Sequence, residues 1–392
     1  MSSRSLSHDL PDTLPEMLRD IGEFVACESP SGDLAAVARS ADVVAAVGTR
    51  RLGRPPERIV IDGCTHLRWS FGEGPSQILL LAHHDTVWPI GSLATRPFEV
   101  VDGVMRGPGC FDMSTGLVMA IHALSALGCP DGVTLLVTGD EEIGSPTSRS
   151  LIEREAVGRT AVLVLEASAD GGALKTARKG VSMYELIVQG RAAHAGLEPE
   201  RGVNATLELA HQVCVIAGMG DVSRGTSVTP TVASSGSAGN TVPSDARLSI
   251  DVRAWDGAEQ DRVDRAMRGL RPHLEGARLQ VEGGPNRPPM EPAASAGLYA
   301  IAGRLAHGLG LSLEHVAVGG GSDGNFTAGV GAPTLDGLGA VGGGAHADDE
   351  HVVVGEIVPR TRLLGALVDD LLRGPGRSAR TNGSLPTGAS AP

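Results

Sequence analysis

Ionisable side chains closely follow three short apolar stretches of this sequence. The groups are His83-His84-Asp85 after residues 78–82, Asp140-Glu141-Glu142 after residues 133–138, and Glu166 after residues 161–165. Such wholly apolar runs are typical of strands buried on both faces of a parallel sheet. Because open α/β sheets place their sites at the carboxyl ends of parallel strands, we expect these side chains to lie close together.

Two glycine-rich segments carry further ionisable residues. Residues 107–112 end in Asp112, and residues 342–351 contain His346. Each residue alone has a structural interpretation: a histidine after a strand is commonly part of the core, paired glutamates favour a helix start, and Glu166 could form a salt bridge. Their convergence on predicted strand ends and glycine-rich loops favours one shared site instead.

Histidine and carboxylate side chains without cysteine form the ligand set of hydrolytic zinc, for which manganese or cobalt can substitute. The five cysteines are scattered and show no Cys-x-x-Cys spacing, which indicates a reducing compartment. A carboxylate shared between two ions would place them in the two-metal regime, roughly 3.5–4 Å apart.

The formal net charge of −13 argues against nucleic acid or an anionic membrane as the main partner. The amino-terminal residues include no apolar run of signal-peptide length, and residues 78–82 are too short to span a bilayer. We therefore expect a cytoplasmic protein. An anionic substrate would need a local positive group against this net negative charge.

The length of 392 residues exceeds one comfortable hydrophobic core and predicts two domains. Strand-like and helix-like segments alternate in residues 1–177 and again in residues 292–373, which predicts an α/β domain with a mixed, mostly parallel sheet flanked by helices. In residues 178–291 the strands alternate polar and apolar side chains, which predicts an inserted α+β domain. Residues 374–392 are rich in Gly, Ser, Pro and Thr and are predicted to be disordered.

The apolar spacing also predicts individual elements. Helices are expected over residues 12–26, 33–47, 116–127, 204–217, 261–274, 298–309 and 356–372, with another beginning at 147. Beyond the three apolar runs, strands are expected over residues 181–189, 226–233, 246–254 and 279–281. These elements would position the strand ends that carry the ionisable side chains.

Residues 83–87, His-His-Asp-Thr-Val, resemble the His-x-Asp-Thr-Val signature of the carboxypeptidase G family of metallopeptidases. That family also includes aminoacylases, acetylornithine deacetylase and succinyl-diaminopimelate desuccinylase. Further segments match in the family's order: Gly107-Pro-Gly-x-x-Asp112, Asp140-Glu-Glu-x-Gly144, Glu166, Ala193-His-Ala-Gly196 and the glycine-rich segment around His346. The resemblance covers about residues 14–372 and implies a zinc-exopeptidase fold with an inserted lid and dimerisation domain.

The resemblance implies a metal ligand set. Asp112 would bridge two zinc ions, one also held by His83 and Glu166, the other by Glu142 and His346. The spacing to the following aspartate favours the first histidine of the pair as the ligand. The family also tends to have a cis peptide bond after the bridging aspartate.

The same resemblance implies catalytic roles. Glu141 would be the general base and acid, taking a proton from a metal-bridging water and delivering it to the leaving amine. Asp85 would orient the imidazole of His83. His194, from the inserted domain, would reach into the site of a partner subunit and help polarise the scissile carbonyl.

Substrate contacts are implied for Asn240, Arg253 and Gly320. Arginine can hold a carboxylate with two parallel hydrogen bonds, although without the family Arg253 would be interpreted as an exposed strand residue. The family commonly has a lysine where this chain has Ser114, which leaves any contact of that lysine open. The basic segment 175–180 could add positive charge near an anionic substrate.

Together these inferences predict a two-zinc hydrolase that cleaves an amide bond adjacent to a free carboxylate, and a homodimer formed through the inserted domain. The leading interpretation is a glutamate carboxypeptidase-like exopeptidase acting on small peptides or N-acyl amino acids. An aminoacylase or N-acyl amino acid deacetylase is the alternative within the family. A catalytically inactive binding protein on the same fold is the alternative of another class, and the complete set of ligands plus Glu141 argues against it.

Overall fold

The three apolar stretches form neighbouring parallel strands in the computed structural model, which describes residues 13–75 and 77–374. Strand β3 (Ile78–His83) lies between β6 (Val133–Thr138) and β7 (Ala161–Val164) and pairs in parallel with both. All residues of these three strands are buried, as the apolar runs predict. Their carboxyl ends therefore open at the same edge of the sheet.

Three more strands complete this six-stranded sheet, whose order is β1-β2-β6-β3-β7-β16. Strand β16 (Thr334–Leu335) adds a further parallel strand beside β7. Strands β1 (Glu57–Ile61) and β2 (Cys64–Phe71) form an antiparallel hairpin at the opposite edge. The sheet is thus mixed and mostly parallel, which confirms the predicted fold class.

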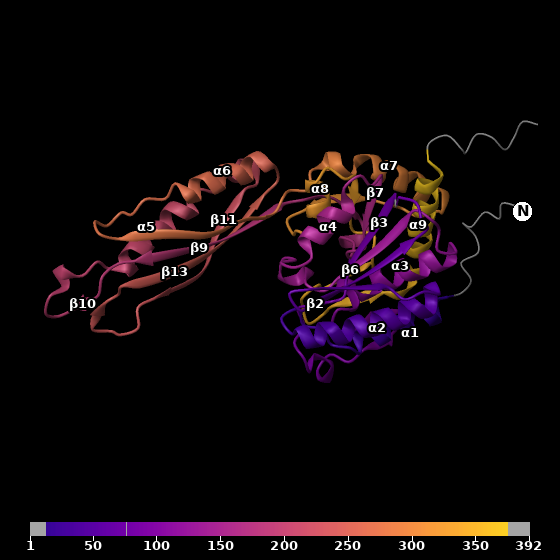
Figure 1. Cartoon of the computed structure of the whole chain (residues 1–392), viewed down its shortest axis with the longest axis horizontal. Helices are drawn as coiled ribbons and strands as arrows, with labels where there is room; N and C mark the ends of the chain where they lie inside the picture. Colours follow the sequence, from indigo (N-terminus) through magenta and orange to yellow (C-terminus); the bar gives the residue numbers. More distant parts are fainter. Residues whose placement is uncertain (1–12, 76, 375–392) are drawn as a thin grey trace, which may run out of the picture.

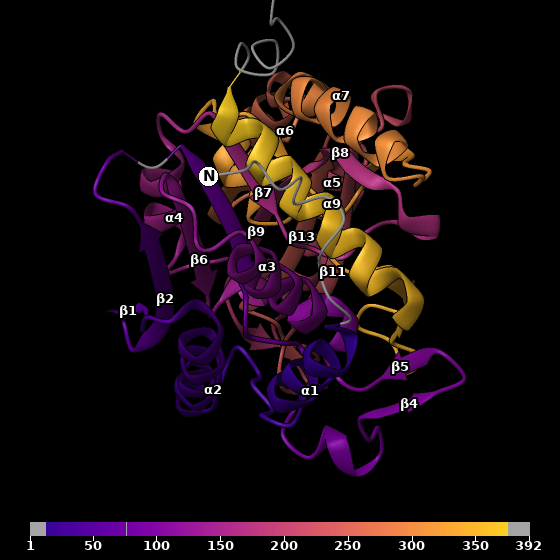
Figure 2. The same cartoon turned by 90° about the vertical axis from the view of Figure 1, so that its right-hand side faces the viewer.

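Helices cover both faces of this sheet. Helices α1 (Leu14–Val25), α2 (Leu34–Leu52), α3 (Thr115–Ala126), α7 (Pro292–Gly308) and α9 (Val354–Arg373) pack into the larger core, which also contains Leu80 of β3. Helices α4 (Arg149–Ala156) and α8 (Gly324–Gly329) cover the other face, where Leu79 and Leu81 point. Figure 2 looks onto the α3 and α9 side of the sheet. Because successive side chains of a strand point to opposite faces, one apolar strand supplies both cores.

Two smaller sheets frame the rest of this large lobe, the name used here for the described residues outside 180–287. Strands β17 (Gly342–Gly343), β18 (His351–Val353), β5 (Val104–Arg106) and β4 (Glu99–Val101) form one antiparallel sheet in that order. Strands β8 (Leu174–Arg178) and β15 (His315–Val318) form a parallel pair. The first of these sheets holds the two glycine-rich segments side by side.

Residues 180–287 form a small lobe that projects from the large one (Figure 1). Strands β9 (Gly180–Gln189), β11 (Ser227–Ser235), β13 (Asp245–Ala254) and β14 (Arg278–Arg287) make an antiparallel sheet in the order β11-β13-β9-β14. Helices α5 (Ala205–Ala217) and α6 (Gly257–Arg268) contribute to the core of this lobe, which is separate from the cores of the large lobe. On this basis we propose that residues 178–291 are an inserted domain, as the sequence predicts.

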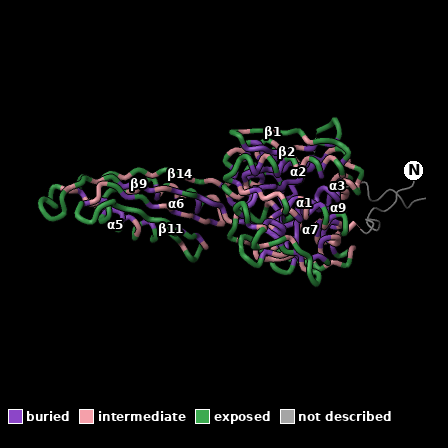
Figure 3. The backbone as a smooth tube through the Cα atoms, turned by 90° about the horizontal axis from the view of Figure 1, so that it is seen from below, coloured by how far each residue is buried: buried purple, intermediate pink, exposed green. Residues whose placement is uncertain are grey.

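Burial distinguishes the two lobes in Figure 3, where exposed backbone runs along much of the narrow small lobe. Strand β13 alternates buried and less buried residues, with Leu248, Ile250 and Val252 inside. None of the helices in residues 13–75 and 77–374 is long and apolar enough to cross a membrane.

The predicted and observed elements differ in a few places. The helix expected over 261–274 is α6, which begins four residues earlier because the Asp256 side chain accepts a hydrogen bond from Glu259 N and caps it. The strand expected over 279–281 extends over the whole of β14. The sequence predicts disorder for residues 374–392. Residues 375–392 lie outside the described residues.

Candidate metal centre and active site

The five predicted metal ligands come from five separate segments and converge at the carboxyl end of the sheet. His83 ends β3, Asp112 follows β5, Glu142 lies in the turn after β6, Glu166 follows β7, and His346 lies between β17 and β18. Nε2 of His83 lies 3.3 Å from Oδ1 of Asp112 and 3.6 Å from Oε1 of Glu166. Nε2 of His346 lies 3.4 Å from Oδ2 of Asp112 and 3.1 Å from Oε2 of Glu142.

These distances describe two ligand groups that share Asp112, which turns one carboxylate oxygen toward each histidine. Two ligands that are each about 2.0–2.1 Å from a tetrahedral ion lie roughly 3.3 Å from one another. The four separations between histidine and carboxylate atoms fit that geometry. The arrangement is what a carboxylate bridging two ions requires.

Unpaired buried atoms at the same place provide an independent test of fit. Nε2 of His83, Oδ1 of Asp112 and Oε1 of Glu142 are buried and accept or donate no hydrogen bond within the part of the chain that is described. Buried polar atoms are normally paired, and Nε2 of His83 and Oδ1 of Asp112 face each other within the cluster at 3.3 Å. His346 also holds a left-handed backbone with φ of 62°, a costly conformation for a residue other than glycine. The donor set and these orphaned atoms fit divalent cations.

Asp85 lies directly behind His83. Nδ1 of His83 donates to the backbone carbonyl of Asp85 at 3.0 Å and lies 3.4 Å from its carboxylate, so Nε2 is left facing the cluster. The buried carboxylate of Asp85 also accepts from Ser31 Oγ at 2.6 Å and from the backbone N–H groups of Glu141 and Glu142, each at 3.2 Å. One side chain therefore fixes both the imidazole and the turn that carries the two glutamates.

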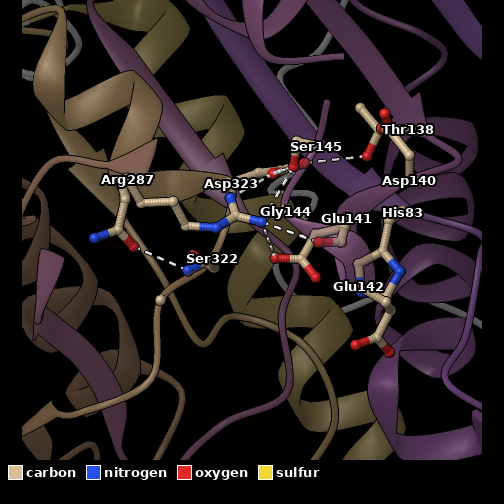
Figure 4. Close-up of polar contacts among 12 residues, drawn as sticks. His83, Thr138, Asp140, Glu141, Glu142, Gly144, Ser145, Arg287, Ser322 and Asp323 are labelled. Atoms are coloured by element: carbon tan, nitrogen blue, oxygen red, sulfur yellow. Dashed lines mark hydrogen bonds and ion pairs between the residues drawn. The ribbon is translucent and has the colours of Figure 1, made fainter. Parts of the chain in front are cut away.

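Glu141 is paired with an arginine that the sequence did not single out. Nη2 of Arg287, the last residue of β14, donates to Oε1 of Glu141 at 2.9 Å and to its backbone carbonyl at 3.0 Å (Figure 4). Nη1 of Arg287 donates to Asp323 at 2.7 Å, and Asp323 also accepts from Ser145 and Thr138. Glu141 also lies within 4.8 Å of His83 and Glu166, so proximity alone would allow it to be a ligand. The adjacent guanidinium argues against this, because it places a positive charge where a cation would be repelled.

The electrostatics of the site are those of a cation-binding cluster. Burial raises the pKa of Glu141 well above its usual range, and the Arg287 guanidinium opposes the shift. Burial also raises the pKa of Glu142 to about 7, while Asp112 and Glu142 raise the pKa of His346 to about 10. Metal ligands bind in their deprotonated forms, so divalent cations would displace the protons that these groups otherwise share.

His84 is not part of the cluster. Its Nε2 donates to the carbonyl of Thr65 at 3.0 Å, and its Nδ1 lies 3.2 Å from Oγ of Ser40, within the large lobe. The alternation of side chains at the end of β3 thus separates the two histidines, and His83 is the one that faces the cluster.

Three of the predicted substrate and catalytic residues lie apart from the cluster. His194 is exposed on β10 (Ala193–His194), which pairs with β12 (Thr241–Val242), and the carbonyl of Asn240 accepts from Ala195 N at 2.9 Å. Figure 1 places β10 at the far end of the small lobe. Arg253, on β13, forms a 2.9 Å ion pair with Asp251. Among the described residues, no hydrogen bond or ion pair joins these three side chains to the five ligands.

Gly320 lies in the loop that precedes Asp323, and its carbonyl accepts from Nη1 of Arg178 at 3.1 Å. Arg178 is also paired with Asp336 through Nε at 2.7 Å and Nη2 at 2.9 Å. The expectation that segment 175–180 offers its positive charge to a substrate therefore does not extend to Arg178, whose donors are already used within the protein.

Comparison with known proteins identifies the family. Residues 79–370 match the model of Peptidase family M20/M25/M40. The chain belongs to this family. It is 30% identical over 376 residues to carboxypeptidase G2 from Pseudomonas sp. (strain RS-16), covering 92% of this chain and 90% of that one. It is 26% identical over 311 residues to the succinyl-diaminopimelate desuccinylase of Wolinella succinogenes, covering 75% and 84%.

Solved structures of the family share the fold. An M20 family metallo-carboxypeptidase from Sulfolobus solfataricus aligns with a TM-score of 0.73 at 15% identity, over 90% of this chain and 98% of that one. Family membership makes the chain a metal-dependent hydrolase, and it confirms the resemblance drawn from the sequence motifs. The Asp112–Met113 peptide bond is cis, as that resemblance implied.

Proposed function

We propose that this protein is a dinuclear-zinc exopeptidase that cleaves an amide bond adjacent to a free carboxylate, with glutamate carboxypeptidase-like specificity. The observation that carries the proposal is the pair of ligand groups that share Asp112, with Glu141 beside them. The similarity to carboxypeptidase G2 over nearly the whole chain supports the choice of branch.

Each residue of the centre has a role in this reaction. Zinc ions held by the two groups would polarise the scissile carbonyl and make a water a strong nucleophile at neutral pH. Glu141 takes the proton from that water and delivers it to the leaving amine. Burial, which raises the pKa of Glu141, suits a group that has to hold a proton between these two steps. Arg287 fixes the orientation of the Glu141 carboxylate.

We infer that Arg253 binds the carboxylate of the substrate. Asn240 and Gly320 are proposed to make further contacts with the substrate. The Arg253–Asp251 pair is about one-third exposed on both sides, so a carboxylate ligand could take the place of Asp251 at modest cost. An arginine forms two parallel hydrogen bonds with such a group.

We also propose a homodimer formed through the small lobe. His194 is exposed and separated from the ligands of its own chain, so a catalytic role for it requires the site of a second chain. The small lobe exposes several large apolar side chains that an interface would cover, namely Leu207, Val215 and Val232.

A deacylase that removes an acyl group from an amino acid is the second candidate. The desuccinylase relatives favour it, because they match about three quarters of this chain. Both candidates use the same metal centre. They differ in the substrate, namely in the peptidyl or acyl group that is joined to the amino acid by the scissile amide. A panel of N-acyl amino acids and dipeptides, with and without a C-terminal glutamate, separates them. If no amide next to a carboxylate is cleaved, the proposed specificity is wrong.

Glu141→Gln tests the assignment of base and ligands. We expect the variant to keep two zinc ions per chain and to lose turnover by about 10²–10⁴-fold, because the proton acceptor is removed and no ligand is. Glu73→Gln, an exposed glutamate of the large lobe, is the matched control and should retain both. Loss of both metal ions in Glu141→Gln would show that base and ligand have been exchanged.

A further inference from the structure

Glu350 is a buried carboxylate, 4% exposed, that accepts four hydrogen bonds. Its Oε1 accepts from the backbone N–H groups of Phe111 at 2.9 Å and Asp112 at 3.1 Å. Its Oε2 accepts from Gly109 N at 2.9 Å and from Trp88 Nε1 at 2.7 Å. Three of the four donors therefore belong to the loop that ends in Asp112.

The location of Glu350 connects two metal-binding loops. Glu350 follows His346 in the same loop and immediately precedes β18, which pairs with β5 just before the Asp112 loop. Its carboxylate therefore joins the loop of His346 to the loop of Asp112. Trp88 Nε1 also donates to Glu350, which connects the segment that follows β3 and His83 to these two loops.

We propose that Glu350 is a positioning residue that sets the two carboxylate oxygens of Asp112 between the two metal sites, an inference that rests on the proposed dinuclear centre. The hydrogen bond to Asp112 N fixes the backbone of the one residue that serves both ligand groups. Sites of this kind tolerate errors of only about 0.5 Å in their ligands. A small shift of Asp112 would therefore weaken both metal sites at once.

The arrangement requires a carboxylate rather than an amide. Each oxygen of Glu350 receives two N–H donors. In Glu350→Gln the amide NH₂ would face one of these donor pairs whichever way the group turned, since an amide nitrogen donates and does not accept. Two donors would lose their acceptor, and the loop would have to move.

The proposal is tested by measuring zinc affinity. Metal-free protein competes for zinc with a chromogenic chelator. We expect Glu350→Gln to bind zinc about 10–100-fold more weakly than the natural chain, the range found when groups that orient metal ligands are removed. Asp349→Asn, an exposed neighbour with the same change of charge, is the control and should stay within about 2-fold. The absorption spectrum of the cobalt-substituted protein should change in Glu350→Gln and not in the control.

A purely structural role predicts a different result. Glu350→Gln would then melt at a lower temperature without metal, while the folded protein would bind zinc with unchanged affinity and an unchanged cobalt spectrum; that outcome overturns the proposal. If Glu350→Gln does not fold, Glu350→Asp carries the test, because it keeps the charge but is one methylene too short to reach all four donors. Affinity and spectrum identical to the natural chain in Glu350→Asp would also overturn it. If the natural chain itself binds no zinc, the dinuclear centre fails first.

Discussion

Replacing Arg287 by methionine removes the cation that two buried carboxylates share. The side chain of Arg287 is 6% exposed, that of Glu141 11% and that of Asp323 4%, so water compensates only in part for the lost donors. Removing one partner of a buried pair typically costs about 3–5 kcal/mol, because a charge is left uncompensated. We expect the free energy of unfolding of the large lobe to fall by this amount. We also expect kcat/KM to fall roughly 10–100-fold as Glu141 loses its orientation.

Urea unfolding followed by tryptophan fluorescence measures the stability change. In a Trp255→Phe background the remaining tryptophans, Trp69 and Trp88, both lie in the large lobe. Arg304→Met is the matched control, because Arg304 lies on α7 of the large lobe and is 61% exposed in its ion pair with Asp370 of α9. Such surface pairs contribute about 0.2–1 kcal/mol.

A loss of less than 1 kcal/mol in Arg287→Met, equal to that of Arg304→Met, would refute the reasoning. Arg287→Lys refines the test. Lysine keeps the charge but lacks the planar fork that reaches Asp323 and Glu141 together, so its stability should fall between that of methionine and that of the natural residue.

Two further predictions concern metal removal and pH. Chelation of the metal ions should abolish activity and lower the melting temperature, because a ligand present at 1,000 times its Kd stabilises the folded state by about 4 kcal/mol; full activity and an unchanged melting temperature in excess chelator would contradict the metal centre. Burial lowers the pKa of His84 to about 4 from the usual 6.5, so the unfolded chain takes up a proton between these pH values that the folded chain does not. Stability of the metal-free protein should therefore fall as the pH drops from 6.5 to 4, by about 3 kcal/mol in total. His84→Asn should remove this part of the pH dependence, and urea unfolding at pH 6.5, 5.5 and 4.5 that shows equal slopes for both proteins would exclude the assignment.

The sequence predicted the elements whose pattern is local. Strand β6 has the predicted bounds because its apolar run ends at turn residues on both sides, and β3 extends only one residue further. The hairpin of β1 and β2 was not predicted, although Leu67, Trp69 and Phe71 alternate with polar residues in the manner of a strand. The convergence of ionisable side chains followed from the rule for strand ends, which needs only local strands and their order.

The supporting residues of the site could not be predicted in this way. Arg287 is 146 positions from Glu141 in the sequence, and Glu350 is 238 positions from Asp112. Neither stands in a pattern that reveals its partner, since each side chain gains its role only when the fold brings distant loops together. The proposed ligands carry recognisable motifs, whereas the groups that hold them in place depend on tertiary contacts.

Because the small lobe is inserted within the large lobe, the ribosome completes the small lobe before it completes the sheet of the large lobe. The chain leaves the large lobe after β8 and returns at α7, so every strand of the small lobe is complete before β16 exists. Val162 of β7 can pair with Thr334 of β16, its partner in the parallel pair, only after Thr334 has been synthesised. At roughly 5–20 residues per second, the ribosome needs on the order of 10–30 s to make the intervening chain. During that interval the edge of β7 is open, and a nascent chain interrupted there would carry a finished small lobe on an unfinished large lobe.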